Sequence, residues 1–174
     1  MFRDHIRTFD ARVDAWIDRH RSPPLDRLFY GLSSAADHSL LWHAAGAARA
    51  ARAGEPTMAV RFSVALGIES AVTNGPIKLL FQRVRPAPDQ VDGPLPFGMR
   101  RPITSAFPSG HATAGFMAAS LLARDSDLGV AWFGLAALVA GSRVYVQMHH
   151  ASDVVAGATL GLAMGMLARR FLPR

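Results

Sequence analysis

Long apolar stretches separated by short polar breaks dominate the pattern of hydrophobic and polar positions. Residues 25–53, 56–81, 128–146 and 151–167 each approach or exceed the about 20 residues that a helix needs to cross a bilayer. Residues 111–123 reach that length only if helix continues into their flanks. The pattern predicts an all-α fold, an integral-membrane bundle of about five transmembrane helices. Because several spans carry charges, a soluble all-α enzyme core is the alternative.

The first 21 residues predict a different kind of helix, in which apolar side chains recur at helical spacing and charged residues fill the remaining faces. The apolar positions are Ile6, Phe9, Val13, Trp16 and Ile17. This pattern is typical of an amphipathic helix that lies in the membrane interface. An amphipathic helix packed on a soluble core is the alternative.

Residues 82–108 form a polar stretch rich in proline. An irregular loop of this length is usually functional or disordered. Because it joins two stretches that carry candidate chemistry, it is predicted to be a lid over an active site. The chain of 174 residues contains no internal repeat, so one domain is expected over residues 1–174.

Composition and charge narrow the expected partners. The formal net charge of +6 suits anionic lipid headgroups and, equally, nucleic acid. The basic residues are scattered between apolar spans without a platform of interleaved aromatic residues, so nucleic acid is not an expected partner. The absence of cysteine excludes disulfides and thiolate metal sites. Lys78 is the only lysine in a chain otherwise rich in arginine.

Several polar residues interrupt the predicted spans, where they are costly in lipid. Asp37, His38 and His43 lie in the first span and are expected to face the bundle or to mark a bend, with a structural role favoured over catalysis. Glu69 lies near the middle of the second span. No motif includes it, so a hydrogen-bonded or protonated packing role is favoured.

Lys78 and Arg85 are separated by two helical turns, which predicts that they share a helix face. Pro86 disfavours helix at the residue before it and so places Arg85 at the end of the helix. Two cations at a membrane boundary suit a phosphate, which arginine binds bidentately and lysine as a point charge. Basic side chains that snorkel to the interface are the alternative.

Ser109 precedes the apolar run from Ala112 and is a natural helix N-cap. The NH groups of the first helical turn form a ready anion site. Gly110 lets an oxyanion approach the backbone closely, and His111 lies beside it in the first turn.

A third stretch contains Arg143, His149 and Asp153. His149 and Asp153 are one helical turn apart, so the carboxylate can accept a hydrogen bond from one imidazole nitrogen while the other faces a substrate. His150 is the competing candidate, three residues from Asp153. Spacing alone favours His149 without excluding His150.

In combination the three stretches resemble the signature of the type 2 phosphatidic acid phosphatase superfamily. The matching residues, in order and without substitution, are Lys78, six residues, Arg85-Pro86; Pro108-Ser109-Gly110-His111; and Ser142-Arg143, five residues, His149, three residues, Asp153. Each motif is weak alone, but their ordered occurrence is specific. The arginine-rich composition further resembles the small actinobacterial phosphatases of the decaprenylphosphoryl-5-phosphoribose type.

The resemblance implies hydrolysis of a lipid phosphate or diphosphate through a phosphohistidine on His149, which Asp153 orients. His111 would protonate the leaving oxygen and then activate water. The phosphoryl oxygens would be bound by Lys78, Arg85, Ser109, the Gly110 backbone NH and Arg143. No metal or other cofactor is implied. Arg83, Arg100 and Arg101 are candidates for headgroup recognition, with surface arginines of a lid as the alternative.

A polyprenyl-linked substrate in the plasma membrane of a bacterium is favoured, either decaprenylphosphoryl-5-phosphoribose or undecaprenyl diphosphate. Phosphatidate or phosphatidylglycerophosphate is the alternative substrate. A vanadate-dependent haloperoxidase would share the oxyanion pocket, but those relatives are larger and lack membrane spans. A non-catalytic membrane protein would not need His111, His149 and Asp153 together.

Overall fold

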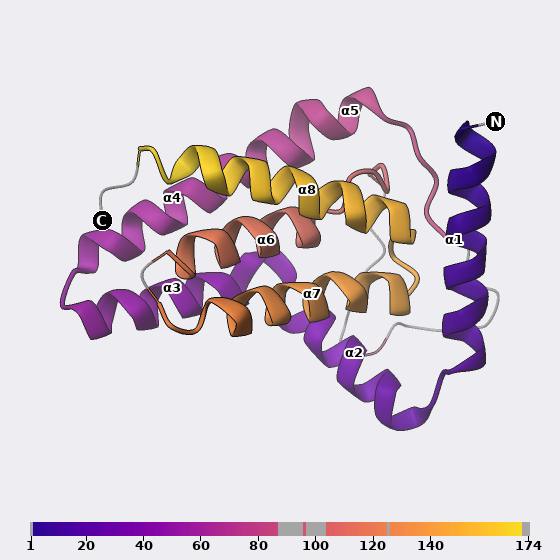
Figure 1. Cartoon of the computed structure of the whole chain (residues 1–174), viewed down its shortest axis with the longest axis horizontal. Coiled ribbons are helices and arrows are strands. Elements are labelled where there is room, and N and C mark those ends of the chain that lie inside the picture. Colours follow the sequence, from indigo (N-terminus) through magenta and orange to yellow (C-terminus); the bar gives the residue numbers. More distant parts are fainter. Residues whose placement is uncertain (1, 87–95, 97–103, 125, 172–174) are drawn as a thin grey trace.

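The computed structural model of the protein describes residues 2–86, 96, 104–124 and 126–171, and their regular elements are all helical (Figure 1). In chain order the elements are α1 (Phe2–Arg19), α2 (Pro23–Ala35), the 3-10 turn η1 (Asp37–Ser39), α3 (Leu40–Ala53), α4 (Pro56–Val72), the π-helical turn η2 (Thr73–Ile77), α5 (Lys78–Leu80), α6 (Gly110–Leu122), α7 (Gly129–Tyr145) and α8 (Ala151–Ala168). The predicted all-α fold class is confirmed.

The first predicted span, residues 25–53, is not one continuous helix. It divides into α2 and α3, which are joined by η1. At this break His38 and Ser39 have φ angles of 53° and 59°, in the left-handed region that interrupts an α-helix. The polar residues of this span therefore mark a bend, and Asp37 lies at it.

The second predicted span, residues 56–81, is helical as far as Leu80 but is not one regular α-helix. After α4 the helix widens at η2, where Gly75 departs from helical geometry and Pro76 removes a donor, and it stops at Leu80. Phe81 has extended backbone geometry, and the backbone NH of Ala106 donates to the carbonyl of Arg83 at 2.9 Å. The prediction that Lys78 and Arg85 share a helix face is therefore wrong.

Helices α6 and α8 pack closely through glycines spaced one turn apart on α8, at Gly157, Gly161 and Gly165. A Cβ atom at Gly157 would lie 2.5 Å from the carbonyl oxygen of Ser109. Small residues at such a stripe let two helix backbones approach each other. Both helices begin at the same end of the bundle, where the NH of Ser109 donates to the carbonyl of Asp153 at 3.1 Å.

Helix α1 crosses that end of the bundle, roughly upright in Figure 1 while α6, α7 and α8 run across the view. The predicted amphipathic helix is confirmed, with Ile17 buried beside Tyr145 and with Trp16 56% exposed. Asp10, expected on a polar face, is instead only 3% exposed. The buried side of α1 therefore carries a carboxylate toward the bundle.

Among the described helices, α8 is long and apolar enough to cross a membrane, and α7 is a shorter apolar helix. Pro and Gly at η2 and the bend at η1 shorten the other candidates. The number of membrane spans thus stays a prediction.

Candidate active site

A cavity of about 510 Å³ brings the three predicted motifs together at the end of the bundle where α6 and α8 begin. Its lining includes residues from all three motifs: Lys78, Arg85, Gly110, His111, Arg143 and His149. Ser109 and Asp153 are fully buried and, within the described chain, do not line this cavity. The motifs therefore converge in two layers, one facing the cavity and one supporting it.

Three cationic side chains face the cavity from three different elements, because Lys78 begins α5, Arg85 follows it in extended chain and Arg143 lies in the last turn of α7. Arg85 Nη1 donates to the carbonyl of Met148 at 2.6 Å, and Arg143 Nη1 donates to the Ser33 hydroxyl. Arg143 Nη1 also lies 3.9 Å from Asp37 Oδ1, so one carboxylate balances part of the positive charge of the three cations. This arrangement suits a phosphoryl group.

His149 lies in the connection between α7 and α8 and is 2% exposed. Its Nδ1 lies 2.6 Å from the carbonyl oxygen of Ala106, so Nδ1 carries the proton and donates it there. Nε2 is left with its lone pair and accepts from Arg85 Nη1 at 3.2 Å. Burial lowers the pKa of His149 to about 4, so the imidazole is neutral near pH 7.

The hydrogen bond expected from His149 to Asp153 is not formed, since Nδ1 and Oδ2 are 3.8 Å apart. Asp153 Oδ2 accepts instead from the backbone NH of His150 at 2.9 Å and thereby caps the start of α8. The carboxylate still lies next to the imidazole, and its charge can stabilise a cationic His149.

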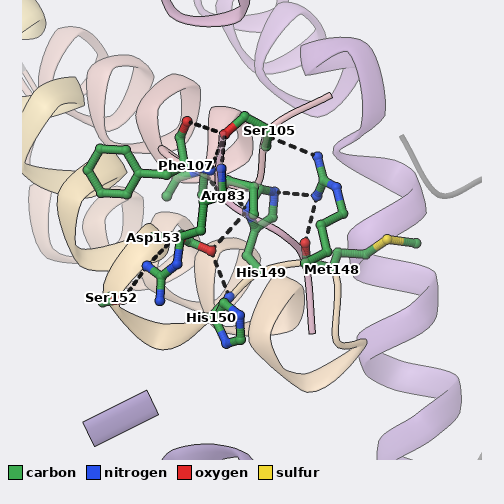
Figure 2. A network of polar contacts seen from close by, with 12 residues as sticks. Arg83, Ser105, Phe107, Met148, His149, His150, Ser152 and Asp153 are labelled. Carbon is green, nitrogen blue, oxygen red and sulfur yellow. Dashed lines mark hydrogen bonds and ion pairs between the residues drawn. The ribbon is translucent and has the colours of Figure 1, made fainter. Parts of the chain in front are cut away.

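His150, the competing candidate, is the next residue in the connection between α7 and α8, and its side chain points to a different side from that of His149 (Figure 2). Its Nδ1 is 3.5 Å from Asp14 Oδ2 on α1, and the nearby Asp14 carboxylate raises the pKa of His150. The described cavity lining contains His149 and not His150. The geometry therefore favours His149 as the reactive histidine, in agreement with the family pattern.

Ser109 is the N-cap of α6, as predicted, and its hydroxyl accepts from the NH of Ala112 at 3.5 Å. Gly110 lines the cavity, and a Cβ there would lie 3.2 Å from Asn74 Oδ1. The first turn of α6 thus presents backbone and His111 to the cavity. Ser109 itself serves as support.

Asp37 is a site residue that the sequence analysis assigned to structure. Its Oδ1 lies 2.9 Å from His111 Nε2 and 3.9 Å from Arg143 Nη1. The bend at η1 brings this carboxylate to the cavity. A carboxylate in contact with imidazole stabilises its protonated form, which a general acid requires. The charge inside a predicted span was the one available signal.

Arg83 does not line the described cavity but turns toward the support layer (Figure 2). Its Nη1 donates to Asp153 Oδ1 at 2.6 Å and its Nη2 to Asp10 Oδ2 at 2.5 Å. Arg83 was predicted as a candidate for headgroup recognition, but both terminal nitrogens of its guanidinium are engaged in these ion pairs. Arg100, Arg101 and most of the predicted lid at residues 82–108 lie outside the described residues.

No three His, Asp or Glu side chains converge as a metal-binding group in the part of the chain that the structure describes.

Residues 58–174, more than half of the chain, match the family model of the PAP2 superfamily. Helical fold, cavity and signature together define a phosphatase of this class, and the protein belongs to the PAP2 superfamily. The family and the enzyme class predicted from sequence are thereby confirmed.

Two solved structures share the fold. The crystal structure of the first transmembrane PAP2-type phosphatidylglycerolphosphate phosphatase from Bacillus subtilis aligns with a TM-score of 0.74 at 23% identity, over 96% of this chain and 86% of that one. The crystal structure of Aquifex aeolicus LpxE aligns with a TM-score of 0.72 at 24% identity, over 92% of this chain and 94% of that one. No curated protein sequence matches the chain.

Proposed function

We propose that the protein hydrolyses a lipid phosphate monoester or diphosphate within a membrane, through a phosphohistidine intermediate on His149. The observation that carries the proposal is the position of His149 Nε2, which faces a cavity lined by Lys78, Arg85 and Arg143. A neutral imidazole lone pair among three cations suits nucleophilic attack on an anionic phosphoryl group.

The reaction balances with the side chains of the cavity. His149 Nε2 attacks phosphorus, the bond from phosphorus to the lipid oxygen breaks, and His111 gives that oxygen a proton. The phosphorylated imidazole is cationic and is stabilised by the Ala106 carbonyl and by Asp153. Water then gives a proton to His111 and attacks phosphorus, which releases phosphate and restores Nε2.

A polyprenyl-linked substrate of cell-envelope precursor synthesis is proposed, either decaprenylphosphoryl-5-phosphoribose or undecaprenyl diphosphate. Ser70, Asn74 and Glu69 add hydroxyl, amide and carboxyl groups to the cavity lining, which suits a headgroup that carries hydroxyls, as the phosphoribose does. The Bacillus subtilis neighbour supports phosphatidylglycerophosphate as the alternative, because its glycerol also carries a hydroxyl.

Integration into the plasma membrane of a bacterium is part of the proposal. It is supported by the apolar helix α8, by Phe9 and Trp16 exposed on α1, and by the transmembrane neighbour from Bacillus subtilis. Exposed aromatic side chains such as Phe9 and Trp16 suit the membrane interface, and an apolar helix such as α8 suits the hydrocarbon.

The test is phosphate release from lipid phosphates in detergent micelles, with His149→Ala compared with His150→Ala. His149→Ala is expected to abolish release, and His150→Ala to retain substantial activity. Of these two histidines, His149 lines the described cavity and His150 does not. The reverse result would refute the assignment. Decaprenylphosphoryl-5-phosphoribose, undecaprenyl diphosphate, phosphatidate and phosphatidylglycerophosphate assayed side by side rank the substrates. Activity lost to a chelator and restored by a divalent metal would contradict catalysis by these side chains alone.

A further inference from the structure

Arg83 lies outside the three-part signature and is the centre of a largely buried charge network. It ties Asp10 of α1 to Asp153 of α8, and Nη1 also donates to the Ser152 hydroxyl at 2.7 Å. Asp10 and Asp153 are 3% and 0% exposed. Two buried carboxylates on different helices therefore share one guanidinium, and one of them, Asp153, lies next to His149.

We propose that Arg83, held by Asp10, is a positioning residue for the Asp153–His149 pair, so that helix α1 controls the geometry of the nucleophile. The inference rests on the proposed reaction at His149. It adds to the site two residues outside the signature, neither of which touches the substrate.

The bonds around Asp153 explain how Arg83 would position it. Oδ1 accepts from Arg83 and Oδ2 from the backbone NH of His150, so both carboxylate oxygens are held. This fixes Oδ2 at 3.8 Å from His149 Nδ1, in reach of the charge that forms there on phosphorylation. Without Arg83 the buried carboxylate would lose its ion-pair partner, which is strongly unfavourable.

Asp10 in turn holds Arg83 and the start of α8. Its Oδ1 accepts from the backbone NH of Ser152 at 2.9 Å, and its Oδ2 accepts from the Ser152 hydroxyl at 2.8 Å. Burial raises the pKa of Asp10, but the hydrogen bonds from Ser152 and Arg83 outweigh it and lower that pKa overall. Asp10 is thus ionised near pH 7 and pairs with Arg83 as a full charge.

The outer side of α1 makes this network responsive to the membrane surface. Phe9 and Trp16 are 46% and 56% exposed and lie on a different side of α1 from the buried Asp10. A helix that places aromatic side chains in an interface is held there by them. The position of α1 in the interface and the position of Asp153 are therefore linked through Asp10 and Arg83.

The experiment measures kcat and KM for phosphate release by the full chain in mixed micelles, for Asp10→Asn, Arg83→Gln and Arg83→Lys. Loss of a residue that orients a catalytic group through a hydrogen bond costs about 10- to 100-fold. We expect Asp10→Asn to lower kcat about tenfold and Arg83→Gln about 100-fold with KM unchanged, and Arg83→Lys to fall between. The Asp10→Asn change in Arg83→Gln is expected to add nothing.

Asp18→Asn is the matched control, because it makes the same charge change on α1 and its carboxylate bonds Gln147 in the same connection as His149, at 3.1 Å. It is expected to keep the wild-type kcat. A rise in KM with kcat retained would make Arg83 a substrate ligand and overturn the inference. A lower melting temperature with kcat retained, or a loss of kcat in Asp18→Asn equal to that in Asp10→Asn, would mean that the network only stabilises the fold. A wild type inactive on every lipid phosphate would instead refute the proposed function, and this inference with it.

Discussion

The glycine stripe between α6 and α8 predicts that a single added methyl group at Gly157 disables the site from a distance. A Cβ at Gly157 would lie 2.5 Å from the Ser109 carbonyl oxygen, about 0.9 Å short of the 3.4 Å at which ordinary contact begins. The obstacle is backbone, so the two helices must separate by about that amount. Overpacking of this kind costs about 1–3 kcal/mol of unfolding free energy.

The separation falls at the start of both helices. It would move His111 on α6 relative to His149, which is tied to the start of α8. A displacement near 1 Å in a reacting constellation lowers the rate about 100-fold. We therefore expect Gly157→Ala to lower kcat about 100-fold and also to lower the melting temperature.

Two further alanine variants separate geometry from stability. Gly134 on α7 has no described atom within 4 Å of an added Cβ, so Gly134→Ala is expected to keep kcat and to gain about 0.5–1 kcal/mol of helix stability. Gly165, two turns further along α8, would clash with Ser120 at 2.6 Å, so Gly165→Ala is expected to lose stability and to keep kcat. Thermal unfolding and phosphate release in the same detergent measure both. If Gly157→Ala kept the kcat of Gly134→Ala, the reasoning would be refuted.

Two other perturbations follow from the site. Asp37→Asn is expected to lower kcat about tenfold because His111 loses the charge that stabilises its acidic form, and a kcat equal to wild type in steady-state assays would contradict this. The neighbouring histidines predict opposite pH slopes of stability. Burial lowers the pKa of His149 to about 4, because the folded state favours the neutral imidazole. The stability associated with the neutral form is fully present above about pH 6.5 and is lost as the pH falls toward 4. The nearby Asp14 carboxylate raises the pKa of His150, so the stability that this pair adds is present below about pH 6.5 and is lost as the pH rises through the folded pKa. Melting temperatures from pH 4 to 8 should show a shallower acid slope in His149→Gln and a shallower alkaline slope in His150→Gln, and unchanged slopes would refute the assignment.

The helices were predictable because apolar runs and local caps are written in contiguous sequence. Ser109 was recognisable as an N-cap from its own neighbours, and structure agrees. The bend at η1 was harder to place, since it uses His38 and Ser39 in left-handed conformation without a glycine. The helix end at Leu80 required knowing that residues near Arg83 pair with the segment at Ala106.

The supporting carboxylates could not be read from spacing at all. Asp37 meets His111 and Asp10 meets Arg83 across more than 70 positions of sequence, and no local period connects such residues. A charge on an otherwise apolar run indicates that a partner exists, but only the packing of helices identifies it. The signature residues could be predicted because they match the family pattern. The residues that support them are determined by how the helices of this chain pack.

The region matched by the family model begins at residue 58, yet the preceding residues supply several of the contacts described above, among them three that reach the site region. Asp10 holds Arg83, Ser33 accepts from Arg143, and Asp37 contacts His111. The N-terminal third of the chain thus contacts several of the candidate site residues from outside the matched region. Exchange of this segment between superfamily members offers a route to retune rate or substrate preference while every signature residue is left in place.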